Sequence, residues 1–358
     1  MSIQSERQRA SQVIAELYKS SFFIRYWEII GRFIGRGKPA SIWMSAAVVM
    51  CANLLMGVTV SALLGETQFT TRNAIIVNTM WVTYSYFMIP LMIGIHGRMI
   101  EFLHTQFTKS LQQEQHIHEL MFWANQWLGQ KILQLFVSLG FGLIVGLLSF
   151  YGIYPSTKFS FGQTLIFFVN FFHLGLTFYG VLSLLAFVLR LKSWHLILYP
   201  DNPATSPILL RLSNELRNYI LFLAIASAIL LLLLGSIGAL STIIIVSMLI
   251  LAWIPILALF VLGNQAFSQQ IIRVKYERLE ELQTKIMKLS NVEKMDTDTM
   301  AYVKGLMDYR DRVNSSQNSL YNPASFINLI GSLALPVLSV ILSNYLKRYS
   351  GLIYGTRA

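Results

Sequence analysis

The sequence predicts an all-α, polytopic transmembrane helical bundle of six or seven spans with a cytoplasmic helical layer. Charged residues make up 13% of the 358-residue chain, about half of the ~25% that is usual in soluble domains. No charged side chain occurs between Tyr219 and Gly263. Because one span needs only ~20 apolar residues, that single stretch is long enough to form two spans.

Seven apolar segments are the candidate spans. The first six contain no Asp, Glu, Lys or Arg, as expected from the high cost of charge in lipid. The seventh is shorter and contains Pro336, so it either spans with a kink or re-enters. Helices satisfy their own backbone groups, so each span is predicted to be helical. The predicted spans are Ile42–Leu64, Asn73–Ile95, Ile132–Tyr154, Thr164–Leu189, Tyr219–Leu240, Thr242–Gly263 and Phe326–Ser343.

The basic residues predict the orientation of these spans. Of the 28 Lys and Arg side chains, 23 lie in the N-terminal tail and in the segments after the second, fourth and sixth spans. The positive-inside rule therefore places the N-terminus in the cytoplasm. The same topology, with attraction to a bilayer carrying anionic head groups, accounts for the net charge of +11 without a nucleic-acid partner. The expected location is the plasma membrane, with the bacterial inner membrane as the first choice.

The N-terminal tail contains a predicted amphipathic helix, Ser11–Ile34. Its apolar residues recur at helical spacing, and Arg25, Trp27 and Arg32 suit a position at the membrane interface. Packing on the protein's own loops is the alternative. The predicted segments are the cytoplasmic amphipathic segment 1–40, the bundle of six spans 41–263 with cytoplasmic loops 96–131 and 190–218, the cytoplasmic helical segment 264–325, the seventh span or re-entrant helix 326–345, and the basic tail 346–358.

Two polar stripes within the spans are the candidate pore or ligand-lining residues. Asn170, His173 and Thr177 follow each other at spacings of three and four, so they share one helix face. Asn78 and Ser85 form a second stripe. Both stripes are uncharged, which suits ions or small neutral molecules. Hydrogen bonding between helices is the structural alternative.

The helix after the sixth span carries a candidate oligomer contact. No proline separates the sixth span from the polar segment that follows, so one helix is expected to continue into the cytoplasm. Its apolar residues at spacings of three, four and three indicate either contact between subunits or packing within the chain. These residues are Leu279, Leu282, Ile286 and Leu289.

The sequence offers little chemistry for catalysis or metal binding. Four histidines, His96, His104, His116 and His118, lie in one predicted loop, but their spacing does not match the i,i+4 pairs of zinc sites on helices. The single cysteine, Cys51, excludes a disulfide within the chain. Phosphate-binding loops and a Gly-x-Ser-x-Gly elbow are absent. We therefore predict no enzyme activity, no metal and no cofactor.

Three segments carry a resemblance to known proteins. The segment from Trp194 to Leu212, with Tyr309-Arg-Asp-Arg-Val313 and Leu335-Pro336, is similar to multi-pass membrane proteins of bacteria that have no assigned function. This resemblance implies a bacterial plasma membrane and assigns no site residue. The span count and orientation are also similar to those of insect chemoreceptor channels, although the last span lacks the Thr-Tyr…Gln-Phe signature of their gustatory branch.

Three functions fit these observations. The first is a homo-oligomeric channel or ligand-sensing membrane protein, for which the uncharged stripes and the long sixth helix argue. The second is a non-catalytic scaffold or accessory subunit that binds a cytoplasmic protein partner. The third is a transporter of a small uncharged solute, which the absence of charge and of internal repeats in the spans disfavours.

Overall fold

A computed structural model describes residues 3–36, 40–66, 72–153, 160–236, 253–290 and 296–320, together with residues 250 and 331. Within these ranges the chain is helical apart from short connections and one isolated bridge between Leu111 and Leu196. The elements are α1 (Ile3–Ser20), α2 (Phe22–Ile34), α3 (Ile42–Leu63), α4 (Arg72–Phe102), the π-helical turn η2 (Leu103–Phe107), α5 (Thr108–Ser110), α6 (Glu114–Trp127), α7 (Lys131–Ile153), α8 (Phe161–Leu191), the 3-10 turn η3 (Pro203–Thr205), α9 (Pro207–Ser236), α11 (Ile254–Ser290) and α12 (Thr297–Ser315).

Four helical stretches of the described residues are long and apolar enough to cross a membrane. A fifth arises if Glu114–Trp127 and Lys131–Ile144, which meet at 49°, form one bent span. The helical fold class is confirmed, but the predicted count of six or seven spans is not. Residues 242–249 and 251–252 of Thr242–Gly263, and nearly all of Phe326–Ser343, lie outside the described residues. The four stretches are Ile42–Leu63, Ile75–Ser110, Phe161–Leu191 and Pro207–Leu231.

The N-terminal tail forms two helices, so the prediction of one amphipathic helix over Ser11–Ile34 was wrong in its bounds. The break falls at Ser21, whose hydroxyl donates to Tyr18 O (2.6 Å) and accepts from Ile24 N–H (3.4 Å). This side chain therefore satisfies the end of α1 and the start of α2 together. The chain changes direction there, and α2 returns toward α3.

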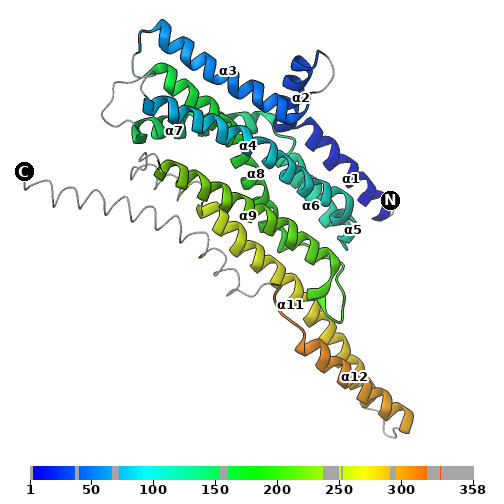
Figure 1. Cartoon of the computed structure of the whole chain (residues 1–358). Helices are drawn as coiled ribbons and strands as arrows, with labels where there is room; N and C mark the ends of the chain where they lie inside the picture. The colour runs from blue at the N-terminus through cyan, green and yellow to red at the C-terminus, as the bar shows by residue number, and fades with distance from the viewer. Residues whose placement is uncertain are drawn as a thin grey trace, which may run out of the picture.

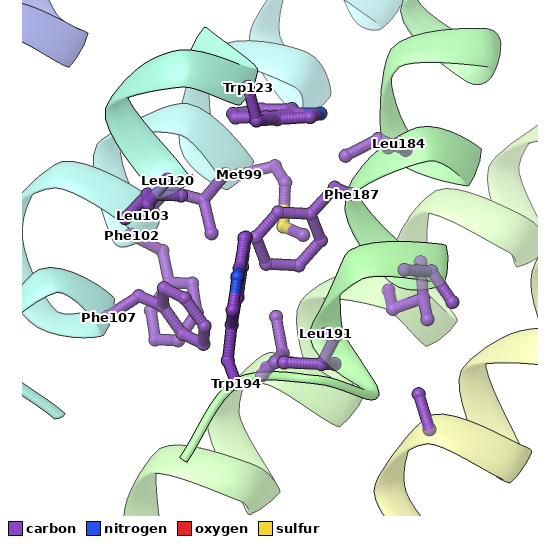
Figure 2. Close-up of a cluster of buried hydrophobic side chains, with 14 of the residues drawn as sticks. Met99, Phe102, Leu103, Phe107, Leu120, Trp123, Leu184, Phe187, Leu191 and Trp194 are labelled. Atoms are coloured by element: carbon purple, nitrogen blue, oxygen red, sulfur yellow. The ribbon is translucent and has the colours of Figure 1, made fainter. Parts of the chain in front are cut away.

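One hydrophobic core joins the predicted cytoplasmic layer to the adjoining ends of the predicted spans, with residues from α1, α4, η2, α6, α8, α9 and α11. Figure 2 shows the ring of Trp194 standing between Phe107 and Phe187, with Trp123 above them. Ring centroids lie 5.8 Å apart for Phe107–Trp194 and 5.4 Å apart for Phe187–Trp194. The Trp194 indole N–H donates to Glu119 Oε2 (2.8 Å). This core holds the C-terminal ends of α4 and α8 together.

The prediction that one helix continues from the sixth span is confirmed over the described residues, because α11 runs unbroken through Gly263 to Ser290. Its second half pairs with α12 as a hairpin that projects from the body of the molecule (Figure 1). The hairpin is closed near its base by Lys275, a buried side chain whose ammonium donates to Ser316 O and Asn318 Oδ1, both at 2.8 Å.

Candidate functional site

The three helices α3, α4 and α8 pack on one another, and the predicted span within each contains no charged side chain. The backbones of α3 and α8 approach closely because both have glycine at the crossing. A Cβ on Gly162 would lie 2.5 Å from Gly57 O, a distance that no larger residue tolerates. This approach places the facing side chains of the two helices within hydrogen-bond reach, as is usual for small residues at helix crossings in membranes.

One carboxylate fixes the C-terminal end of α3 to the N-terminal end of α8. Glu66, just after α3, accepts hydrogen bonds from Ser61 Oγ (2.8 Å), Ser160 Oγ (2.6 Å), Phe161 N (2.6 Å) and Gly162 N (3.2 Å). Burial raises the pKa of this carboxyl, but the hydrogen bonds lower it by more, so the pKa lies below the ordinary value. Glu66 thus caps the N-terminus of α8 and ties it to α3.

Below this cap lies a layer of buried polar side chains, at most 2% exposed, which we call the polar layer. Its α3 and α8 amides meet at one backbone carbonyl, because Asn53 Nδ2 (3.3 Å) and Asn170 Nδ2 (2.9 Å) both donate to Ile166 O. The structure therefore brings a predicted site residue, Asn170, to a partner that the sequence analysis did not single out. The members of the polar layer are Asn53 on α3, Asn78 and Ser85 on α4, and Gln163 and Asn170 on α8.

The second predicted stripe joins the polar layer from α4. Trp81 packs its ring on Phe171 of α8 at a centroid distance of 4.8 Å. Asn78 and Ser85 lie three residues before and four residues after Trp81, so they are on the same face of α4 and are directed toward α8. Asn170 of the first predicted stripe and both residues of the second thus belong to one helix interface.

The polar layer carries more hydrogen-bonding groups than its members satisfy. Within the part of the chain that the structure describes, six of its side-chain atoms have no partner. A buried group left in this state costs about 1–3 kcal/mol, so a molecule that supplies donors and acceptors would be stabilised there. The six atoms are Asn53 Oδ1, Asn78 Oδ1, Asn78 Nδ2, Ser85 Oγ, Gln163 Nε2 and Asn170 Oδ1.

His173 does not belong to the polar layer, because its side chain faces α2. Its Nδ1 lies 2.6 Å from Val169 O, a group that can only accept, so Nδ1 carries the proton and Nε2 accepts from the Tyr26 hydroxyl at 2.8 Å. Trp27 packs beside it at 5.4 Å between centroids. Trp27 is 3% exposed, so its ring packs within the chain, which was the alternative given for this segment. The Thr177 hydroxyl donates to His173 O (3.2 Å).

The predicted pore or ligand-lining residues thus lie inside the protomer. Asn170 and His173 are 0% and 3% exposed, and Thr177 is half-buried. A path that uses these side chains would therefore run through one protomer, between its own helices.

The four candidate oligomer-contact residues differ in burial within the hairpin. Leu282 and Ile286 are buried on the side of α11 that packs on α12, whereas Leu279 and Leu289 are half-buried. Packing within the chain therefore uses two members of the stripe. The Tyr309 hydroxyl of α12 also donates to Asp201, which lies between α8 and α9. This bond joins two segments of the resemblance described above.

The histidines of the predicted loop 96–131 do not form one cluster. His116 stacks on His195 at 5.0 Å and its Nδ1 accepts from the His195 backbone N–H (3.1 Å), whereas His96 is buried on α4 and His118 is exposed. Burial is the largest cause of the lowered pKa of His116. Among the described residues no group of three or more His, Cys, Asp or Glu side chains is placed to hold a metal ion.

Comparison of this chain with protein-family models, with curated proteins and with solved structures found no match.

Proposed function

We propose that the protein is a homo-oligomeric membrane channel or ligand-sensing membrane protein in which the polar layer contacts a small uncharged solute. The observation that carries this proposal is the set of six buried polar atoms without a partner, which lie between helices apolar enough to span a membrane. The layer contains donors and acceptors but no charge. A neutral molecule with both kinds of group, water included, is the partner that such a layer favours.

The contacts of α8 suggest how occupancy of the polar layer is transmitted. Asn170 takes part in the layer, and His173, one helical turn further along α8, is held by Tyr26 of α2. A solute that separates α3 or α4 from α8 would therefore shift the residue that docks α2. Because α2 follows directly on α1, which belongs to the predicted cytoplasmic layer, the Tyr26–His173 pair would link the polar layer to that cytoplasmic layer.

The experiment combines assembly with permeation. The full chain is purified in mild detergent, its mass is measured, and it is reconstituted for conductance in planar bilayers and for water and glycerol flux in vesicles. Ser85→Ala and Asn170→Leu are compared with Thr59→Val, which removes an exposed hydroxyl from α3 outside the layer. A defined oligomer whose flux changes several-fold in the two layer variants and not in Thr59→Val supports the proposal. A silent monomer contradicts it.

A scaffold is the second candidate function, and one observation favours it. The projecting α11–α12 hairpin exposes large apolar side chains outside the candidate spans, where water would otherwise cover them. A protein partner or a second copy of the chain would bury this surface. The side chains are Tyr276, Met287, Met300, Tyr302 and Met307, which are 41–66% exposed.

A further inference from the structure

The corner between α1 and α2 forms an open groove that the polar layer does not use. Its volume is about 510 Å³. The α2 side of the groove is one helix face, because its members follow each other at spacings of three, one and three. The groove is lined by Glu16, Lys19 and Ser20 of α1 and by Arg25, Glu28, Ile29 and Arg32 of α2.

The connection of α2 to α3 places this groove beside the membrane. Only seven residues separate the end of α2 at Ile34 from the start of α3 at Ile42, and α3 is a candidate span. The opposite face of α2 is fixed to the bundle, since Phe23 N donates to Gln134 Oε1 (3.2 Å) and Tyr26 bonds to His173. The groove face of α2 therefore stays turned outward at the level where α3 enters the bilayer.

The apolar side chains at the groove require a hydrophobic partner. Ile29 is 67% exposed and Phe33, on the next turn, is 87% exposed. Strong exposure of two large apolar residues on a short amphipathic helix next to a span is the pattern of a helix that lies against lipid. Acyl chains can cover both residues, and a soluble anion would leave them in water.

The charged side chains of the groove have both signs. Lys19, Arg25 and Arg32 supply three cations, and Glu16 and Glu28 supply two carboxylates. All five are exposed, and none makes an ion pair within the described residues. Cations at this depth match the phosphate of a lipid head group. The two carboxylates match a positive group carried on the same head group.

We infer that the α1–α2 groove binds a phospholipid whose head group carries both a phosphate and an ammonium group, as in phosphatidylethanolamine. Arg25, Arg32 and Lys19 hold the phosphate, Glu16 and Glu28 accept hydrogen bonds from the ammonium group, and Ile29 with Phe33 contacts the acyl chains. The lipid then completes the outer face of α2, the helix that carries Tyr26.

Native mass spectrometry of the detergent-purified full chain tests this site. The protein is incubated with equal amounts of phosphatidylethanolamine, phosphatidylglycerol and phosphatidylcholine, and each retained lipid is counted. The unmodified protein is expected to retain phosphatidylethanolamine several-fold over the other two. The double variant Arg25→Gln/Arg32→Gln is expected to retain about tenfold less phosphatidylethanolamine, because its charge-assisted hydrogen bonds to the phosphate are lost. Arg98→Gln, at an exposed residue of α4, is the matched control.

Two further arms separate the parts of the inference. Glu16→Gln/Glu28→Gln should remove the preference for phosphatidylethanolamine over phosphatidylglycerol while phosphate-bearing lipid is still retained. A photoreactive phosphatidylethanolamine should label peptides within residues 16–33. Equal retention of the three lipids by the unmodified protein, equal retention by Arg25→Gln/Arg32→Gln and Arg98→Gln, or displacement by inorganic phosphate would overturn the inference. The assay reads lipid retention, so its result is independent of whether the protein conducts.

Discussion

The Tyr26 hydroxyl donates to Nε2 of His173 across 2.8 Å, and this bond joins the N-terminal tail to the fourth predicted span. Burial raises the pKa of Tyr26 to about 12, so the hydroxyl keeps its proton at physiological pH. The histidine, whose other nitrogen donates to Val169 O, is held as the neutral tautomer that accepts this bond. A residue expected to line a path therefore serves first as the docking point of α2.

Removing this bond should loosen α2 from the bundle. Tyr26→Phe leaves the Nε2 acceptor unpaired, and a double-mutant cycle with His173→Phe should give a coupling free energy of about 0.6–1.7 kcal/mol, the range measured for hydrogen bonds between membrane helices. Thermal unfolding in detergent measures it. Tyr86→Phe is the control, since no hydrogen bond of the Tyr86 hydroxyl is found among the described residues. A coupling near zero would mean that α2 is held by its other contacts.

The contact between Glu66 and α8 should make stability depend on acid. The pKa of Glu66 is lowered in the folded protein from an ordinary value of 4.5. Its contribution to stability is therefore fully present above pH 4.5 and is lost as the pH falls through the folded-state pKa. The unfolding temperature of the unmodified protein should fall over this interval, and that of Glu66→Gln should fall less. Glu280→Gln, on the exposed side of α11, should behave like the unmodified protein. Parallel curves for all three proteins would contradict the capping role.

The buried Lys275 should hold the end of the hairpin. Lys275→Met keeps the length of the side chain but removes the donors to Ser316 O and Asn318 Oδ1. Loss of hydrogen bonds to a charged group costs about 1.5–3 kcal/mol, so hydrogen exchange over residues 314–320 should become tenfold faster or more. Lys285→Met, which removes an exposed ion pair with Glu281, should leave that segment unchanged. Equal exchange in both variants would show that Lys275 does not fix the hairpin.

The sequence predicts the helical fold class because charge in lipid is so costly that its absence marks the spans. Helix ends are less predictable from hydropathy. Residues 96–102 contain His, Arg and Glu and were expected to be a loop, yet α4 continues through them to Phe102. Its residues Met99, Ile100 and Phe102 are buried in the core around Trp194. Tertiary packing extends the helix where composition indicates its end.

The candidate site was only partly predictable for a similar reason. Asn78, Ser85 and Asn170 were identified as polar residues within apolar helices. Asn53 carries the same signal, as the only Asn or Gln of the first predicted span, but it has no polar neighbour at helical spacing to form a stripe. Gln163 precedes the predicted start of the fourth span by one residue. The meeting of Asn53 and Asn170 at Ile166 O depends on how α3 packs on α8, which no single-helix pattern contains.

The most direct test of the account is solute flux through vesicles that contain Asn170→Leu. This substitution keeps a similar side-chain volume and removes an amide whose one hydrogen bond, to Ile166 O, lies within α8, so the fold should persist. We expect an unfolding temperature within a few degrees of the unmodified protein and a several-fold change in conductance or in water and glycerol flux. Unchanged permeation in a correctly folded Asn170→Leu protein would contradict the polar layer as the place where solute meets the protein.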